Sequence, residues 1–307
     1  MSKIGRKVRQ LFQDPKSFFL YVISRYGRFI PDKTYLQLKY SLAWGKKLDF
    51  ENPKTLNDKF NWLKVNYHDE RLHQFADKYE VKQFVSKTIG EEYVVPCLGV
   101  WDSFDEIDFT KLPNQFVIKT THDSSGAYIV RDKRKMDVDA ARKHCEGSLR
   151  RGWYYPNREW VYKDVRRRII ADTFLDDHSH DKSGISLNDY KFWCFNGFPK
   201  AMYVTVKDKE IFENFYDKDF NPMPINHRFA RHEPEFEKPQ GFEKMWDLSG
   251  KLATATKSPF VRVDFFNVDG KIYFGEFTFY DWAGLRPFAD EKQEIELGSW
   301  LKLPYEE

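Results

Sequence analysis

Residues Val261 to Gly284 read VRVDFFNVDGKIYFGEFTFYDWAG, and this stretch decides the fold class. Apolar residues alternate with polar ones on both sides of Asn267-Val268-Asp269-Gly270, which predicts two β-strands around a turn. We expect a three-residue loop, made of a type I turn followed by Gly270 in the left-handed conformation. The stretch is therefore predicted to form an antiparallel hairpin.

The loop length fixes the register of this hairpin and therefore the face on which each side chain lies. A three-residue loop pairs Asp264 with Phe274 and Arg262 with Glu276. One face is then apolar and consists of Val261, Val263, Phe265, Tyr273, Phe277 and Phe279. The other face is polar and carries Arg262, Asp264, Glu276 and Thr278. A two-residue loop would instead place Asp264 and Glu276 on opposite faces.

The polar face brings together two carboxylates, one guanidinium group and one hydroxyl group. Oxygen ligands of this kind suit Mg²⁺, which usually takes one or two carboxylates together with phosphates of a substrate. The alternative interpretation is a half-buried hairpin whose polar face simply contacts water.

Length and composition limit the classes of protein to consider. The 307 residues provide room for two domains. Lys and Arg number 50 against 47 Asp and Glu, so the charge balance gives no reason to expect nucleic-acid binding. The three cysteines are far apart, which argues against a disulfide framework and a zinc site. No apolar run is long enough to span a membrane, and the N-terminus does not resemble a signal peptide.

The first 90 residues are predicted to be helical. Residues 1–30 are basic and then aromatic, and their first basic residues are Lys3, Arg6, Lys7 and Arg9. This segment either packs on the body of the protein, which we favour, or lies on a membrane surface. Thr55 followed by Asp58 predicts a helix that starts with a capping box. Lys78 and Lys82 fall on the next helix, where each is interpreted as a surface charge.

Residues 115–130 read QFVIKTTHDSSGAYIV and predict a strand, a loop of small polar residues and a second strand. Lys119 lies near the end of the first strand. Such a loop can close over a polyphosphate, because its backbone N–H groups donate hydrogen bonds and the lysine supplies a positive charge. The segment lacks Gly-Lys-Ser/Thr and is therefore no Walker loop. A plain hairpin turn is the alternative.

Asp137-Val138-Asp139 resembles the Asp-x-Asp sequence with which many sugar transferases bind a metal ion. It precedes a helical run over residues 140–151. We therefore favour Asp137 as the N-cap of that helix.

Two more strands are predicted before the hairpin, at Ile169–Leu175 and Asp189–Gly197. Lys191 and Asp189 share a face of the second of these strands. Residues 207–240 are irregular and contain four prolines, and long excursions of this kind are usually functional or mobile.

Four segments stand in an order that resembles the ATP-grasp superfamily. They are Phe116 to Lys119 with its loop, the strand Ile169–Leu175, the strand Asp189–Gly197, and the hairpin from Val261 to Thr278. The chain resembles most closely the TupA-like ATP-grasp proteins, which are found among polysaccharide and teichuronopeptide biosynthesis functions. The resemblance runs from Asn52 to Phe288.

This resemblance implies an α+β fold in which two α+β subdomains hold ATP, preceded by an N-terminal helical region. The helical region would comprise residues 1–90 and the ATP-grasp region residues 91–307. Within the ATP-grasp region, residues 115–175 would form a smaller lid subdomain. Residues 176–307 would form the larger subdomain with the metal-binding hairpin.

The resemblance also implies a role for each candidate residue. Lys119 would contact the α- and β-phosphates of ATP. The loop over the triphosphate would be formed by His122, Ser124, Ser125 and Gly126. The strand end that presents backbone groups to adenine would consist of Asp172, Thr173, Phe174 and Leu175. Lys191 would reach the terminal phosphate or an acyl phosphate, and Arg262 would neutralise developing charge. Mg²⁺ would be held by Asp264 and Glu276, with Thr278 where relatives often have Asn.

Three positions depart from the usual pattern of relatives. Asp123 stands in the loop, where its negative charge would face phosphates. Asp172 follows Ala171 where a glutamate is usual near the adenine strand. Asp281 replaces a common proline and is either an extra metal ligand or a loop residue.

We therefore expect an ATP- and Mg²⁺-dependent ligase that joins a carboxylate to an amine through an acyl phosphate. The carboxylate substrate is expected to be a uronic acid or an amino acid within a surface polysaccharide. One alternative is a sugar transferase of the same pathway that uses Asp137 and Asp139. Another is a nucleotide-binding protein that has lost catalysis, as Asp123 suggests. We expect the protein in the cytoplasm, with contact between its basic N-terminus and the inner face of the membrane left open.

Overall fold

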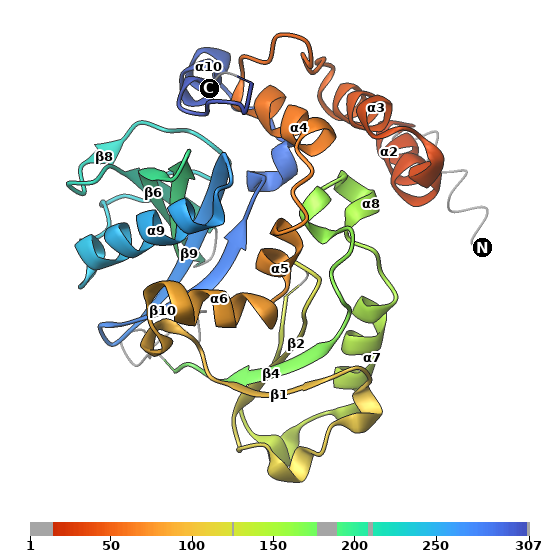
Figure 1. The fold of residues 1–307 in the computed structure, drawn as a ribbon, viewed down its shortest axis with the longest axis vertical. Helices are drawn as coiled ribbons and strands as arrows, with labels where there is room; N and C mark the ends of the chain where they lie inside the picture. The colour runs from red at the N-terminus through yellow and green to blue at the C-terminus, as the bar shows by residue number, and fades with distance from the viewer. Residues whose placement is uncertain (1–14, 125, 177–188, 208–210, 306–307) are drawn as a thin grey trace.

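The computed structural model describes residues 15–124, 126–176, 189–207 and 211–305. Its strands form two antiparallel sheets, which Figure 1 shows as two separate units. The large sheet has the order β10-β9-β5-β6-β7-β8 and the small sheet has the order β1-β4-β2-β3. Together with the surrounding helices, these sheets confirm the expected α+β class.

The strand bounds are as follows. The small sheet contains β1 (Cys97–Trp101), β2 (Phe116–Thr120), β3 (Tyr128–Val130) and β4 (Ile169–Thr173). The large sheet contains β5 (Asp189–Phe195), β6 (Phe198–Lys207), β7 (Ile211–Tyr216), β8 (Pro222–Met223), β9 (Phe260–Val268) and β10 (Lys271–Thr278). Strand β1 pairs with β4, so the small sheet begins at Cys97, ahead of the residues 115–175 expected for the lid.

Helices precede the small sheet, as the sequence predicts. They are α2 (Pro15–Tyr26), α3 (Asp32–Trp44), α4 (Leu56–Asn66), α5 (Leu72–Ala76) and α6 (Glu80–Ile89). The later helices are α7 (Val138–Leu149), α8 (Tyr154–Asn157), α9 (Phe242–Thr256) and α10 (Glu291–Ser299). Among the described residues, no helix is long and apolar enough to cross a membrane. The basic residues Lys3, Arg6, Lys7 and Arg9 lie outside the described residues.

Two predicted helix starts are confirmed. Helix α4 begins with a capping box, in which the backbone N–H of Asp58 donates to Thr55 Oγ1 at 3.1 Å and that of Thr55 donates to Asp58 Oδ2 at 3.2 Å. Asp137 caps α7, because its Oδ1 accepts from the backbone N–H of Ala140 at 2.9 Å. Asp137 therefore acts as a helix cap, as we favoured over a metal-binding motif.

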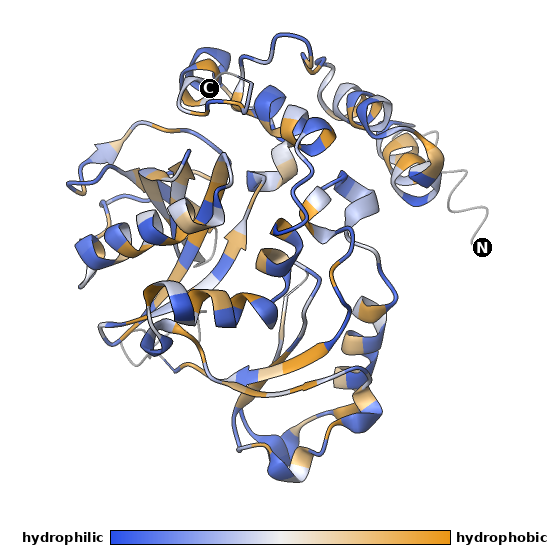
Figure 2. Ribbon diagram, viewed as in Figure 1, coloured by the Kyte–Doolittle hydropathy of each residue, from blue (hydrophilic) through white to orange (hydrophobic). Residues whose placement is uncertain are grey.

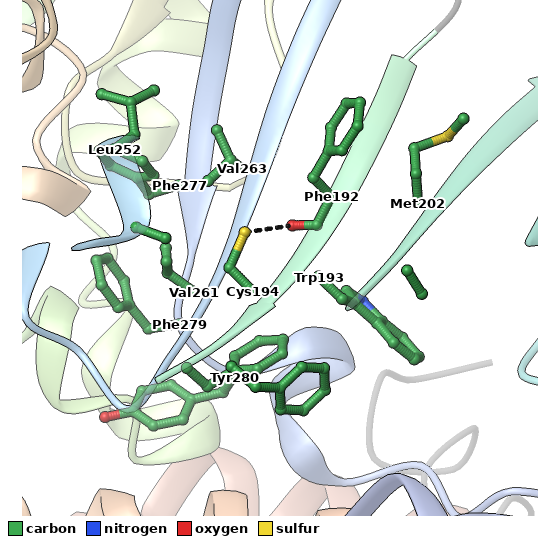
Figure 3. Packing of buried hydrophobic residues seen from close by; sticks show 14 of the residues in the cluster. Phe192, Trp193, Cys194, Met202, Leu252, Val261, Val263, Phe277, Phe279 and Tyr280 are labelled. Carbon is green, nitrogen blue, oxygen red and sulfur yellow. Dashed lines mark hydrogen bonds between the residues drawn. The ribbon is translucent and has the colours of Figure 1, made fainter. Parts of the chain in front are cut away.

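The main hydrophobic core includes residues from both faces of the large sheet, since the neighbouring residues Phe192 and Trp193 of β5 both belong to it and are fully buried. Phe192 and its partner Val263 of β9 share one of these faces. Helix α9 covers them and contributes Leu252, as Figure 3 shows. Helices α4, α5 and α6 add Phe60, Phe75 and other apolar residues to the same core, so these helices belong to the large unit. Strand β4 of the small sheet is apolar at its start and hydrophilic at its end (Figure 2).

The hairpin between β9 and β10 differs from the predicted one in its loop. Asp269 and Gly270 both have positive φ, at 50° and 83°, and Lys271 pairs with Val268. This is a two-residue turn of the kind with two left-handed residues, so the predicted three-residue loop is wrong. Because of this shift, Tyr273 lies opposite Phe266 on the polar side and Phe274 occupies the expected place of Tyr273 on the apolar face.

A β-bulge restores the predicted grouping of the carboxylates. The register shifts between Phe274 and Glu276, which leaves Gly275 as an extra residue in β10. Beyond the bulge, Glu276 pairs with Asp264 and Thr278 pairs with Arg262. The extra residue thus offsets the shorter loop, and both carboxylates lie on the same face of the sheet.

Candidate functional site

A row of charged residues crosses three strands of the large sheet. Lys191 of β5 pairs with Asp264 of β9, and Asp264 pairs with Glu276 of β10. Directly opposed residues in antiparallel strands have side chains on the same face, with Cβ atoms about 5 Å apart. Arg262 and Thr278 follow in the next row. The predicted metal-binding and catalytic residues are therefore brought together.

Arg262 is held by two carboxylates. Its Nε and Nη2 donate to the two oxygens of Asp264 at 2.7 and 2.6 Å, which is a bidentate pair. Its Nη1 donates to Asp281 Oδ1 at 2.6 Å. Asp281 Oδ2 accepts from Trp193 Nε1 at 2.8 Å. Asp281 is 3% exposed, and its contacts identify it as the residue that fixes Arg262.

The pKa values of the two candidate metal ligands shift in opposite directions. Burial raises the pKa of Asp264 to about 6, although the positive charges of Arg262 and Lys191 oppose this rise. Burial would also raise the pKa of Glu276, but four cations outweigh it and lower that pKa. These cations are Lys78, Arg262, Lys191 and Lys119. Glu276 is therefore anionic at neutral pH, with a side chain that is 41% exposed.

Two lysines from the small unit and from α6 share one carboxylate. Lys119 Nζ lies 2.8 Å from Asp172 Oδ2, and Lys82 Nζ lies 3.1 Å from Asp172 Oδ1. The carboxylate of Asp172 is thus paired with the two lysines, while the expected contact of the backbone here with adenine stays a prediction. Because Lys119 contributes to the lowered pKa of Glu276, Lys119 lies within electrostatic range of the row of charged residues on the large sheet.

Lys78 and Lys82 were missed as site residues at the level of sequence, where both were interpreted as surface charges. Lys78 Nζ lies 3.6 Å from Glu276 Oε2, and its side chain is 17% exposed. The backbone N–H of Lys78 donates to the carbonyl of Thr121 at 3.0 Å. The segment before α6 therefore joins the small sheet to the metal-binding hairpin. A single lysine in a sequence predicted to be helical carries no local signal of such a contact.

The loop after β2 has an interior part and an exposed part. His122 is buried with its Nε2 3.2 Å from the carbonyl of Arg151, and burial lowers its pKa. Asp123 is 1% exposed and accepts a hydrogen bond from Ser148 Oγ. The side chains of His122 and Asp123 therefore do not face the loop surface, and the expected cover of the triphosphate by this loop stays a prediction. Ser124 and Gly126 are exposed, and Ser125 lies outside the described residues.

The end of β4 carries the remaining predicted nucleotide contacts. The backbone N–H of Thr173 donates to the carbonyl of Pro96 at 3.0 Å and is therefore used within the small unit. The Arg131 guanidinium lies 5.0 Å from the centre of the Phe174 ring. Phe174 and Leu175 follow the last residue of β4 and are partly buried.

The carboxylates fit a magnesium ion only together with phosphate oxygens. Within the described ranges, no group of three or more Asp, Glu, His or Cys side chains could hold a metal by itself. Glu276 has its nearest cations at 3.6 Å, beyond hydrogen-bond distance. Each oxygen of Asp264 accepts one bond from Arg262 and keeps a further lone pair. Two carboxylates completed by phosphates are the ligands that Mg²⁺ usually takes.

A family model described as TupA-like ATP-grasp matches residues 58–302. No curated protein matches the chain. Similar solved structures include D-alanine–D-alanine ligase from Bacillus anthracis complexed with ATP, at 15% identity and a TM-score of 0.45, covering 74% of this chain and 64% of that chain. The ATP-grasp ligase PsnB with a minimal precursor is similar at 11% identity and a TM-score of 0.43, covering 79% and 65%.

A third similar structure is the ADP complex of PurK, an N5-carboxyaminoimidazole ribonucleotide synthetase. It has 15% identity and a TM-score of 0.43, and the match covers 84% of this chain and 58% of that chain. The chain thus spans less than two thirds of the length of these three structures. The likeness to each is distant, whereas the family model covers most of the chain.

Proposed function

The chain belongs to the TupA-like ATP-grasp family, and from that premise we propose that it is an ATP-dependent carboxylate–amine ligase. The observation that carries this proposal is the row of Lys191, Asp264 and Glu276. Lys119 of the small sheet and Lys82 of α6 add positive charge. Such an arrangement suits phosphoryl transfer, which needs positioning and charge neutralisation more than covalent chemistry by the protein.

The proposed reaction has two steps. A carboxylate oxygen of the substrate attacks the γ-phosphorus of ATP, and the bond from phosphorus to the ADP oxygen breaks. The amine then attacks the carbonyl carbon of the acyl phosphate, and phosphate and a proton leave as the amide forms. When bound by Asp264 and Glu276, Mg²⁺ supplies charge neutralisation at the phosphate oxygens.

The side chains of this chain would bind and orient the reactants. Lys119 and Lys82 would bind phosphate oxygens of ATP, since both ammonium groups lie at one carboxylate. Lys191 lies 2.9 Å from Asp189 and opposite Asp264, which suits contact with the transferred phosphoryl group. Arg262 is fixed by Asp264 and Asp281 before substrate arrives, and a preorganised charge of this kind lowers the barrier most.

We further propose that the carboxylate belongs to a uronic acid or amino acid of a surface polysaccharide. The resemblance to proteins of polysaccharide and teichuronopeptide biosynthesis supports this substrate. A cytoplasmic location at the inner face of the membrane is part of the same proposal. Exposed aromatic residues of α2, such as Phe19 and Tyr26, are compatible with such contact.

The two alternative functions receive less support from the structure. A sugar transferase that used Asp137 as a metal ligand would lose the N-cap of α7. The loss of catalysis was inferred from the charge of Asp123, and this carboxylate is buried against Ser148. The ligase is therefore the function that the geometry supports best.

Trapping of the acyl phosphate with hydroxylamine tests the proposal without knowledge of the natural amine. The protein is incubated with ATP, Mg²⁺ and each of D-glucuronate, D-galacturonate and L-glutamate, and hydroxamate and ADP are measured. We expect equal amounts of both products with at least one acid. Glu276→Gln should reduce the rate by about a hundredfold, the usual effect of removing one charge-stabilising group.

Glu291→Gln provides the matched control. Glu291 lies on α10, pairs with Lys46 at the surface and is 62% exposed. This variant should keep full activity, and both variants should unfold at the temperature of the unmodified protein. Equal rates in the Glu276→Gln variant and the unmodified protein would contradict the proposed role of the hairpin.

A further inference from the structure

The turn that follows β10 has an unusual backbone. Residues Asp281–Gly284 form a short helical turn in which Trp282 and Ala283 have φ values of 48° and 56°. L-residues rarely adopt this left-handed conformation, and such strain persists only where the surroundings enforce it. Trp282 directly follows Asp281, which fixes Arg262. The strained turn is therefore linked to Arg262 through Asp281.

Helix α4 enforces this turn from one side. Asn57, Asn61 and Lys64 lie at i, i+4 and i+7, so they share one face of the helix. Their side chains donate to the carbonyl oxygens of Arg286, Gly284 and Ala283. Three hydrogen bonds to consecutive parts of one loop hold its backbone in place and leave the side chains of Trp282 and Arg286 to other contacts.

Two arginines lie at this turn, since Arg228 lies over the Trp282 ring and Arg286 follows Gly284 by two residues. The Arg228 guanidinium lies 3.5 Å from the centre of the Trp282 ring. Burial and the nearby charge of Arg286 both lower the pKa of Arg228, although Glu213 opposes them. Among the described residues, no carboxylate lies within ion-pair distance of the guanidinium groups of Arg228 and Arg286. Glu213 instead accepts the backbone N–H of Arg228 at 3.2 Å.

The chemistry of this group suits an acidic ring. A guanidinium group stacked on an indole ring keeps its N–H edges free, and a carboxylate can accept two of these donors at once. Trp282 is 39% exposed, so part of its apolar surface remains available for a ligand. An uncompensated pair of guanidinium groups gains most from an oxyanion that neutralises both.

We propose, on the basis of the ligase function above, that Arg228, Arg286 and Trp282 form the subsite for the acceptor substrate and bind a carboxylate-bearing sugar ring. The two guanidinium groups bind the carboxylate, and Trp282 contacts the ring. Because Asp281 connects Trp282 to Arg262, the bound sugar is positioned beside the reacting groups. The substrate class is therefore a sugar acid.

Isothermal titration calorimetry with D-glucuronate tests this subsite in the full chain. D-Glucose serves as the uncharged ring and acetate as the carboxylate without a ring. We expect D-glucuronate to bind at least tenfold more tightly than either, since each bidentate charged contact contributes about a factor of ten or more. Arg228→Met and Arg286→Met should each weaken D-glucuronate binding about tenfold, and Trp282→Leu should weaken it as well.

Two further variants separate binding from folding. Arg228→Lys keeps the charge and loses the bidentate geometry, so its affinity should fall between those of the unmodified protein and Arg228→Met. Arg134→Met is the control, because Arg134 pairs with Asp132 at the surface and is 82% exposed. Weak or absent binding of D-glucuronate, or equal affinity in all variants, would overturn the subsite.

A second measurement distinguishes failure of the subsite from failure of the ligase. Stabilisation by ATP with Mg²⁺ should be the same in Arg228→Met as in the unmodified protein. Neither Arg228 nor Arg286 is among the residues proposed to bind ATP. Loss of this stabilisation in Arg228→Met would also count against the subsite. If ATP with Mg²⁺ fails to stabilise the unmodified protein, the ligase function fails, whatever the result with D-glucuronate.

Discussion

Arg262 is bound by a second carboxylate, that of Asp281, and this contact could not be inferred from the sequence alone. Asp264 takes two of its donors and Asp281 takes a third. All three groups are buried, and removing one partner of a buried ion pair commonly costs about 3–5 kcal/mol. Asp281 therefore contributes both to stability and to the orientation of Arg262.

Asp281→Asn should reduce turnover while ATP binding is kept. The amide keeps an acceptor oxygen for one bond but removes the charge that fixes Arg262, so we expect a loss of about 1–3 kcal/mol in the free energy of unfolding. The rate of hydroxamate formation should fall, and the dissociation constant of ATP with Mg²⁺ should hardly change. Urea unfolding, steady-state kinetics and calorimetry measure the three quantities.

Asp247→Asn is the control for this substitution, because Asp247 is exposed on α9. It should leave stability and turnover unchanged. An unchanged rate in Asp281→Asn would show that Arg262 needs no second carboxylate.

The face on which an individual residue lies could be predicted where polar and apolar residues alternate along a strand. The alternation in β9 and β10 identified Arg262, Asp264 and Glu276 on one face. Lys82 had no such pattern, since its importance comes from Asp172, which lies 90 positions away in the sequence. The burial of His122 and Asp123 could not be predicted, because residues of a loop have no period from which burial can be inferred.

At the scale of elements, two differences between the predicted and the observed hairpin offset each other. The loop is one residue shorter than predicted, and β10 contains a bulge that was not predicted. The sequence Asn-Val-Asp-Gly is compatible with either loop length, so the turn alone could not decide the register. The bulge at Gly275 decides it, and a glycine inside a strand is a recognised sign of a bulge. Gly275 thus places Glu276 opposite Asp264.

Gly275→Ala should move Glu276 and weaken the metal-binding pair. A Cβ atom at this position would lie 3.1 Å from the carbonyl oxygen of Asp264, so the strands must shift. We expect a loss of about 1–3 kcal/mol in stability, as for overpacking elsewhere. The part of the ATP-induced thermal stabilisation that requires Mg²⁺ should decrease.

Gly147→Ala is the matched control for this substitution. Gly147 lies in α7, and nothing lies within 4 Å of a Cβ atom there. Alanine should stabilise this helix by about 0.5–1 kcal/mol. If Gly275→Ala also stabilises the protein and retains the full Mg²⁺ effect, the bulge has no role in placing Glu276.

Helix α4 should give the protein a characteristic dependence of stability on pH. Burial lowers the pKa of Lys64 to about 7, although the charge of Glu159 opposes this. Between that value and the ordinary pKa near 10.5, the unfolded state binds more protons than the folded state. The cost of holding Lys64 charged in the interior is therefore present below pH 7 and is relieved as pH rises toward 10.

Lys64→Met removes this titration. The free energy of unfolding of the unmodified protein should rise relative to that of Lys64→Met from pH 7 to 9, by at most about 1.4 kcal/mol per pH unit. Urea unfolding at each pH measures the difference. Parallel curves for the two proteins would show that Lys64 does not change its protonation in this range.

At the scale of the whole molecule, the segment from Asp77 to Lys82 joins the two sheets. Lys78 contacts Glu276 on one side, and its backbone N–H binds Thr121 on the other. Arg168, at the start of β4, donates to Asp77 Oδ2 at 2.9 Å. Figure 1 shows α6 between the two sheets. Residues of this one segment therefore contact both the small sheet and the hairpin of the large sheet.

The two-unit α+β plan was predictable because the strands and helices have clear periods. The contribution of α4, α5 and α6 to the large core was not, since apolar stripes do not identify their partners. The placement of Cys97–Trp101 beside β4 likewise depends on pairing across about 70 residues of chain. Long-range pairing of this kind leaves no trace in a single sequence.

In the function proposed above, ATP with Mg²⁺ is held jointly by β2 of the small sheet and by the β9–β10 hairpin. Hydrogen exchange of the full chain with and without ATP and Mg²⁺, read by mass spectrometry, is the decisive measurement. We expect slower exchange in both Phe116–Thr120 and Phe260–Thr278 on addition of the nucleotide and metal, and in neither segment for Glu276→Gln with Lys119→Met. Protection confined to one sheet, or absent from both, would contradict it.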